Sequence, residues 1–273
     1  MPLIRTALAL ILVVLWLFSL PSYASVLPGV LVPEMRKGSG HSPSAFHYLM
    51  GSAYIDDGML DNAIWEYQKV LEISPDCPEA HNNLGAIYFG KGMKEKAISE
   101  YRQAIEQDAA FLAPHYNLAV LYAETGISDQ AILEYRAVLA IDPDYPKAHN
   151  NLGVIYFNKG MIDDAISEYS KELAHDPLAL ETRYNLATAY FSKGMIEEAV
   201  SEYEVVLSAN PHDAKAHNNL AVAYYARGCH DLAWKHAQIA TRLDDPPHPQ
   251  FIELLKKTSF PVGERKESDK APR

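Results

Sequence analysis

The sequence has 273 residues, of which 48% are hydrophobic and 22% are charged, a composition that is typical of folded proteins rather than disordered ones. The formal net charge of −11 argues against a nucleic-acid partner, because phosphates require clustered Lys and Arg. Two cysteines, Cys77 and Cys229, cannot form a multi-bridge disulfide framework, and no C-x-x-C motif is present.

Residues 1–24 are typical of a secretory signal peptide. Arg5 precedes an apolar stretch at residues 6–20, and Ser22 and Ala24 provide the small residues of an A-x-A-like cleavage site. We expect cleavage after Ala24 and export, to the periplasm or beyond the cell. The alternative is an uncleaved anchor in the inner membrane. Fifteen helical residues would then span only about 22 Å of a hydrocarbon core about 30 Å thick.

Residues 25–43 contain Pro, Gly and Ser and are predicted to form a linker. From residue 44 the sequence repeats every 34 residues without an insertion. The six windows are 44–77, 78–111, 112–145, 146–179, 180–213 and 214–247.

The same residue types recur at fixed positions of each window. Position 8 is Gly or Ala, position 11 is Tyr, position 15 is Gly and position 20 is Ala, while position 24 is Tyr in five windows. Residues three and four apart share a helix face, so positions 4, 7, 8 and 11 predict one amphipathic helix and positions 20, 24 and 27 a second. The Gly at position 15 ends the first helix, and Pro at position 32 in four windows follows the second.

This pattern resembles the tetratricopeptide repeat (TPR) family over residues 44–247. The resemblance implies an all-α fold, an α-α superhelix in which six helix-turn-helix repeats form a right-handed solenoid. Residues 248–258 predict a capping helix with Phe251, Leu254 and Leu255 on one face, and residues 259–273 a polar tail. Glu172 stands at position 27, where the other windows carry Val or Ala, and is expected to loosen the fourth repeat.

Positions 4, 7, 8 and 11 of the first helix form a stripe that faces neighbouring helices (the packing stripe). Position 4 carries a basic side chain and lies close to the centre of this stripe. We expect these side chains to pack between helices, because neighbouring repeats are about 8–10 Å apart, too far for two of them to share one zinc ion. Position 23 carries Glu in five windows, which we expect on a solvated outer face. No metal site, cofactor or catalytic residue is predicted. The position-4 residues are His47, His81, His115, His149, Arg183 and His217.

Position 6 is asparagine in five successive windows. It lies about 150° around the first helix from the packing stripe, and asparagine is a poor residue for a helix interior. Its amide could pair with the N–H and C=O groups of an extended peptide. Alternatively, the residue was inherited by duplication and bonds to an adjacent helix. These residues are Asn83, Asn117, Asn151, Asn185 and Asn219.

The TPR resemblance favours peptide binding, because the asparagine run is similar to the asparagine ladder in the TPR arrays of O-linked N-acetylglucosamine transferase. First helices line the groove in such arrays, and positions 5 and 12 add flanking residues. Position 12 lies about 90° around the first helix from the packing stripe, so its aromatic rings either anchor a ligand or support the next helix. The dicarboxylate clamp of TPR chaperone cofactors needs Lys at position 5, which is only Tyr or Asn here. The flanking candidates are Tyr116, Asn150, Tyr184, Phe157 and Phe191.

Position 5 alternates between Tyr and Asn, which gives a second period of 68 residues. Either a two-repeat block was duplicated, or the alternation reflects contacts to a ligand. Taken together, the sequence predicts a non-catalytic module that binds an extended segment of a protein partner in the cell envelope. The alternative is a scaffold or accessory subunit of an envelope assembly, a polysaccharide machine or a secretion machine, which uses its outer face.

Overall fold

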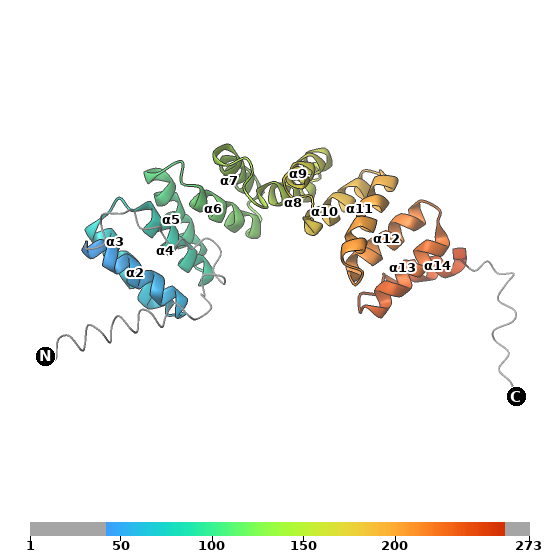
Figure 1. Ribbon diagram of the computed structural model, residues 1–273, viewed down its shortest axis with the longest axis horizontal. Helices are drawn as coiled ribbons and strands as arrows, with labels where there is room; N and C mark the ends of the chain where they lie inside the picture. Colours follow the sequence, from blue (N-terminus) through green and yellow to red (C-terminus); the bar gives the residue numbers. More distant parts are fainter. Residues whose placement is uncertain (1–41, 260–273) are drawn as a thin grey trace, which may run out of the picture. The chain divides into compact units, whose positions relative to one another are not determined.

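The structure is a computed structural model that describes residues 42–259 (Figure 1). The predicted signal peptide, nearly all of the linker and all of the tail except Ser259 lie outside these residues. Helices account for the regular structure between residues 42 and 259, and no strand occurs there. The helices are α2 (Pro43–Asp56), α3 (Leu60–Ile73), α4 (Pro78–Gly90), α5 (Lys94–Gln107), α6 (Leu112–Glu124), α7 (Ser128–Ile141), α8 (Ala148–Asn158), α9 (Ile162–His175), α10 (Leu180–Ser192), α11 (Ile196–Ala209), α12 (Ala214–Ala226), α13 (His230–Arg242) and α14 (Pro249–Ser259).

Each repeat is a pair of helices joined by a short turn. The second helices begin 34 residues apart, at residues 60, 94, 128, 162, 196 and 230. The position-15 glycine of every turn has a positive φ, between 73° and 84°, a backbone conformation that L side chains rarely adopt. This requirement explains why position 15 never varies.

The chain divides into two compact units after Ile141. Helices α2 to α7 belong to the first unit, and within it each first helix packs on its own second helix and on the second helix of the preceding repeat. Helices α8 to α14 belong to the second unit and follow the same order of packing (Figure 1). Each unit is therefore a stack of helix pairs of the predicted all-α class.

In the first, second and fourth repeats, a buried tyrosine at position 24 packs against a glycine at position 8. Tyr101 and Tyr169, at position 24, are fully buried against Gly85 and Gly153 at position 8. A Cβ atom added to either glycine would lie 2.6 Å from the tyrosine ring. The small residue at position 8 is thus a steric requirement, as the repeat pattern predicted.

The last repeat has Ala237 at position 24, and helix α14 covers the end of the second unit. Leu255 is buried in this cluster, and Phe251 and Ile252 pack against it. The predicted apolar face was wrong at one position, because Leu254 is 42% exposed. Leu254 lies about 160° of helical rotation from Ile252, which takes the inner place instead.

A charge-assisted hydrogen bond joins the two helices of the first five repeats. The position-4 nitrogen lies 2.6–2.7 Å from the carboxylate of the position-23 glutamate in every case. The expectation of solvated glutamates was wrong, since Glu66 is buried and the other four are half-buried. The pairs are His47–Glu66, His81–Glu100, His115–Glu134, His149–Glu168 and Arg183–Glu202.

Glu172 does not loosen the fourth repeat in the way expected. Its buried carboxylate accepts hydrogen bonds from the backbone N–H groups of Lys147 (3.0 Å) and Asn150 (3.3 Å) at the start of α8. The first helices α4, α6, α10 and α12 begin at position 1 of their windows, whereas α8 begins two residues later. The carboxylate therefore caps a shortened helix, where the positive end of the helix dipole favours an anion.

Candidate interaction surface

The predicted peptide-binding asparagines at position 6 lie on the first helices α4, α6, α8, α10 and α12. In the first unit, Asn83 is fully buried and its amide nitrogen donates to the hydroxyl groups of Tyr48 (2.8 Å) and Tyr67 (3.1 Å). Asn117 is 3% exposed and donates to the side-chain oxygen of Asn82 at 3.0 Å. Both asparagines therefore tie their repeat to the repeat before it.

The second unit contains the same bonds, but with more accessible side chains. The amide nitrogen of Asn185 donates to the side-chain oxygen of Asn150 at 3.0 Å. Asn219 donates to the hydroxyl groups of Tyr184 (2.8 Å) and Tyr203 (3.3 Å). Asn185 and Asn219 are half-buried, as is Asn151 on α8. The second unit thus brings three position-6 side chains to the surface of successive first helices.

These contacts show why position 5 can be either Tyr or Asn. The acceptor in each bond is the position-5 residue of the preceding repeat, which is a tyrosine hydroxyl in two pairs and an asparagine carbonyl in the other two. Both groups offer an oxygen lone pair to the same amide. Tyr and Asn are therefore interchangeable at position 5 as partners of the next repeat.

The flanking candidates take different roles. Asn150 is buried and Tyr184 is half-buried, and both serve as acceptors between repeats. Tyr116 is half-buried with its ring edge-on to Tyr135, 5.9 Å between centroids. Phe157 and Phe191 are half-buried on α8 and α10, and Phe191 also packs against the core cluster of the second unit. The candidates therefore line successive first helices but do not converge on a single point.

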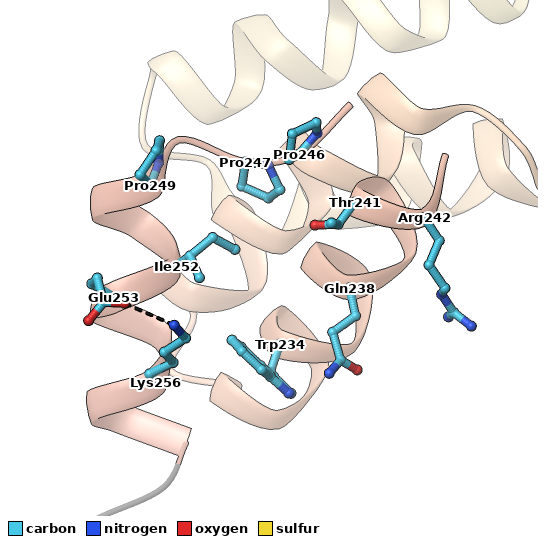
Figure 2. Close-up of a pocket in the computed structure, with 10 residues that line it drawn as sticks. All are labelled: Trp234, Gln238, Thr241, Arg242, Pro246, Pro247, Pro249, Ile252, Glu253 and Lys256. Carbon is cyan, nitrogen blue, oxygen red and sulfur yellow. Dashed lines mark hydrogen bonds and ion pairs between the residues drawn. The ribbon is translucent and has the colours of Figure 1, made fainter. Parts of the chain in front are cut away.

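A hollow that the repeat pattern did not predict lies between α13 and α14. Figure 2 shows Trp234 on α13 and Ile252 on α14 facing the space between the helices, with Pro246 and Pro247 at one end. Its volume is about 820 Å³. On the wall formed by α14, Lys256 pairs with Glu253 at 2.9 Å (Figure 2). The sequence signals were Trp234 and the run of prolines before the capping helix, but the cavity depends on where that helix docks.

Other chemistry in the described part of the chain is limited. Between residues 42 and 259, no group of three or more His, Cys, Asp or Glu side chains is arranged to hold a metal ion. Cys77 and Cys229 are free thiols, and burial raises the pKa of Cys77 above its ordinary value. Over the same residues, no helix combines the length and apolar character needed to cross a membrane.

Paired helices that repeat at a fixed interval, with first helices packed on the second helix of the preceding repeat, define a helical-repeat protein of the all-α solenoid class. A family model described as "TPR repeat" matches residues 51–92, 128–160 and 187–228, and one described as "Tetratricopeptide repeat" matches residues 78–110. The chain is a tetratricopeptide repeat protein, a family whose fold serves protein–protein interaction.

Solved structures with the same fold include YrrB, described as a TPR protein with an unusual peptide-binding site. It is 18% identical, with a TM-score of 0.60 over 71% of this chain and 96% of that chain. A MamA protein is 26% identical, with a TM-score of 0.58 over 63% and 94%. A tetratricopeptide repeat protein from Parabacteroides merdae is 18% identical, with a TM-score of 0.64 over 79% and 89%. No curated protein sequence matches the chain.

Proposed function

We propose that this protein is a non-catalytic interaction module that binds an extended segment of a partner along the first helices α8, α10 and α12 of its second unit. The observation that carries the proposal is the half-buried state of Asn151, Asn185 and Asn219 on these three helices. Their counterparts Asn83 and Asn117 in the first unit are buried. A peptide can reach only side chains that extend to the surface, so the asparagine site is restricted to the second unit.

The amide chemistry supports this assignment. The hydrogen bonds of Asn185 and Asn219 to the preceding repeat use the amide nitrogen, so each carbonyl oxygen is available to accept a backbone N–H of a peptide. First helices of neighbouring repeats are about 8–10 Å apart, which corresponds to about three residues of an extended chain. One asparagine would therefore contact every third peptide residue.

Aromatic side chains beside the asparagines would anchor apolar residues of the same peptide. Tyr184, Phe157 and Phe191 are half-buried on α8 and α10, so part of each ring is accessible. Aromatic rings held by a packed scaffold are effective anchors because little conformational entropy is lost on binding. The description of YrrB, a protein of the same fold, as having a peptide-binding site agrees with this use of the fold.

The proposal is tested with peptides selected by the full chain from an unbiased 12-residue display library, whose affinities are then measured by fluorescence anisotropy. The triple variant Asn151→Ala/Asn185→Ala/Asn219→Ala is expected to bind the selected peptides at least about tenfold more weakly, because each buried peptide hydrogen bond contributes about 0.5–1.5 kcal/mol. The matched control, Ser167→Ala/Ser201→Ala, changes exposed residues of second helices and should bind normally. Unchanged affinity of a triple variant that keeps its helical circular dichroism contradicts the proposal.

We also propose, from the N-terminal sequence, that the protein acts outside the cytoplasm. Residues 1–24 support this location through their basic start, apolar stretch and A-x-A-like end. Sequencing the N-terminus of the protein purified from its native cell envelope tests the proposal. A start at Ser25 indicates cleavage and release, a start at Met1 in the membrane fraction indicates an anchor, and recovery from the cytoplasm contradicts export.

A second candidate function is a scaffold that binds through the outer, second-helix face. Trp65 on α3 and Leu133 on α7, both at position 22, are 52% and 58% exposed in the first unit. Both side chains lie on the second-helix face, two repeats apart, so a partner that covers this face would bury both. If the selected peptides bind the Trp65→Ser and Leu133→Ser variants normally but lose affinity for the triple asparagine variant, the first-helix surface rather than this face carries peptide binding.

A further inference from the structure

The sixth repeat differs from the other five in the pair of residues that joins its two helices. His217 of α12 occupies position 4, and position 23 carries His236 of α13 instead of glutamate. The two Nδ1 atoms are 2.8 Å apart and the ring centroids 5.0 Å apart. A direct bond between two imidazoles therefore replaces the bond between a base and a carboxylate.

The hydrogen-bond partners determine which nitrogen carries each proton. Nε2 of His217 lies 3.1 Å from the carbonyl oxygen of Pro211, which can only accept, so this nitrogen carries a hydrogen. In neutral His217, Nδ1 is then a lone-pair acceptor. Nδ1 of His236 must donate to it, which leaves Nε2 of His236 unprotonated.

The other repeats show what this position normally holds. His115 is placed to donate from Nδ1 to Glu134 (2.6 Å) and from Nε2 to the carbonyl of Ala109 (3.3 Å), and the hydrogen bond to Glu134 raises the pKa of His115 above its ordinary value. In the fifth repeat, Arg183 donates to Glu202 and to the carbonyl of Pro177 at the same sequence spacings. The interchange of His with Arg indicates that position 4 can accommodate a cation beside the glutamate.

In the sixth repeat, position 23 supplies an imidazole instead of a carboxylate to the position-4 histidine. One added proton can be shared across the Nδ1–Nδ1 bond, but a second would leave two N–H groups facing each other at 2.8 Å. The charged and titratable neighbours are Lys235 beside His236, Tyr224 on α12, and Glu204 on α11, to which the Tyr224 hydroxyl donates a hydrogen bond. Burial, followed by the charges of His217 and Lys235, lowers the pKa of His236 to about 4, against the opposing effect of Glu204.

Helix α13 supports the end of the second unit. Ala233 and Ala237 on this helix are buried in the cluster that also contains Leu255 of the capping helix α14. The capping helix packs on α13, and its Phe251 ring lies 5.6 Å from the ring of Tyr225 on α12, so separation of α13 from α12 divides the surface on which α14 docks. The His217–His236 bond therefore lies at a joint between the last repeat and its cap.

We propose that the His217–His236 pair is an acid-sensitive joint, and that mild acid opens α13 and α14 locally while the His–Glu and Arg–Glu pairs hold the preceding repeats closed. The driving force is proton linkage between the open and the folded state. In the open state each histidine takes a proton near its ordinary pKa, whereas the folded pair resists the second proton. The folded state is then lost in favour of the open one as pH falls.

The sign of the effect follows from the pKa of His236. Its folded value of about 4 lies below the ordinary value of 6.5, so the open state binds more protons throughout this interval. The stabilising contribution of the neutral His236 is fully present above pH 6.5 and is lost as pH falls toward 4. The open population of α13 and α14 should therefore grow on the order of tenfold between pH 7 and pH 5.

Amide hydrogen exchange of the full chain, corrected for intrinsic rates at pH 7 and pH 5, tests the proposal. Peptides from α13 and α14 are expected to lose protection on the order of tenfold at pH 5, while peptides from α6 and α7, joined by His115–Glu134, keep theirs. His236→Glu, which installs the pair of the other repeats, should abolish the loss in α13 and α14. Equal protection of α13 and α14 at both pH values overturns the proposal.

Two further variants keep the test decisive if His236→Glu alters the fold. His236→Gln can donate to Nδ1 of His217 but cannot be protonated, and it should also abolish the acid response. Glu134→His creates the same imidazole pair with His115 in the third repeat, and α6 and α7 should then lose protection at pH 5. Acid sensitivity that persists in His236→Gln overturns the proposal.

Discussion

Asn219 donates a hydrogen bond of 2.8 Å to the hydroxyl group of Tyr184, which lies 35 residues earlier in the chain and one repeat away. The same offset joins Asn83 to Tyr48, Asn117 to Asn82 and Asn185 to Asn150. A polar ladder therefore runs along the first helices of each unit and holds successive repeats in register. Asn83, Asn117, Asn185 and Asn219, which the sequence predicted to bind a peptide, therefore have a structural role.

Replacement of a position-6 asparagine, which donates the hydrogen bond of the ladder, should lower the free energy of unfolding more where the side chain is buried. Asn117→Ala removes the 3.0 Å bond to Asn82 inside the first unit and is expected to lower the free energy of unfolding by about 1–3 kcal/mol. Asn185→Ala removes an equivalent 3.0 Å bond from a half-buried site and should cost less, because water can replace the lost partner. Urea denaturation measures both. A larger loss in Asn185→Ala would contradict this ranking.

The tyrosine–glycine contact can be tested by a double-mutant cycle. Gly153→Ala places a Cβ atom 2.6 Å from the Tyr169 ring and is expected to destabilise the protein by about 1–3 kcal/mol. With Tyr169→Ala already present, the same change meets no ring and should be neutral or stabilising, since alanine is the better helix former. The sixth repeat already combines Ala221 with Ala237 at these positions. Equal costs in the two backgrounds, measured by urea denaturation, would rule out a steric origin.

The third repeat should become less stable as pH rises above neutrality. The hydrogen bond to Glu134, outweighing burial, raises the pKa of His115 above its ordinary value. A raised folded pKa means that this stabilisation is fully present below pH 6.5 and is lost as pH rises through the folded pKa. His115→Arg, which introduces the residue found at position 4 of the fifth repeat, should keep the bond and reduce the loss of stability. Chemical denaturation at pH 6, 7, 8 and 9 compares the two, and identical pH profiles would refute the assignment.

Replacement of the buried carboxylate in the fourth repeat should expose the start of α8. Glu172→Val, which installs the residue found at position 27 in three other repeats, is expected to cost about 1–2 kcal/mol, the range for loss of a helix cap. Amide exchange at Lys147 and Asn150 should accelerate in this variant. Glu172→Gln retains an acceptor oxygen and should show a smaller effect. An unchanged exchange rate in Glu172→Val would mean that α8 re-forms from an earlier residue.

Much of the architecture was predictable because the same residue types recur every 34 residues, wherever the local structure of each repeat requires them. The invariant position-15 glycine predicted the turn, and its positive φ is the reason for the invariance. The small residue at position 8 predicted the close approach that Gly85 makes to Tyr101. These requirements arise within one helix pair, so the sequence of one repeat contains them.

The roles of positions 6 and 23 were not predictable in the same way. The angular argument placed Asn117 away from its own partner helix but did not account for Asn82 in the preceding repeat. It likewise placed Glu134 on a solvated face, although His115 reaches it from the first helix. Helical rotation describes the faces of one helix, whereas these contacts depend on how two helices are offset and rotated against each other.

The sequence by itself determined the number, order and type of the repeats, since these follow from backbone conformation and side-chain volume at short range. Only the tertiary structure decided which polar groups meet, including the Asn219–Tyr184 bond and the imidazole pair His217–His236. A hydrogen bond needs two atoms about 3 Å apart. That separation is set by how helices pack within a repeat and between neighbouring repeats, which involves residues 19 and 35 positions apart in the chain.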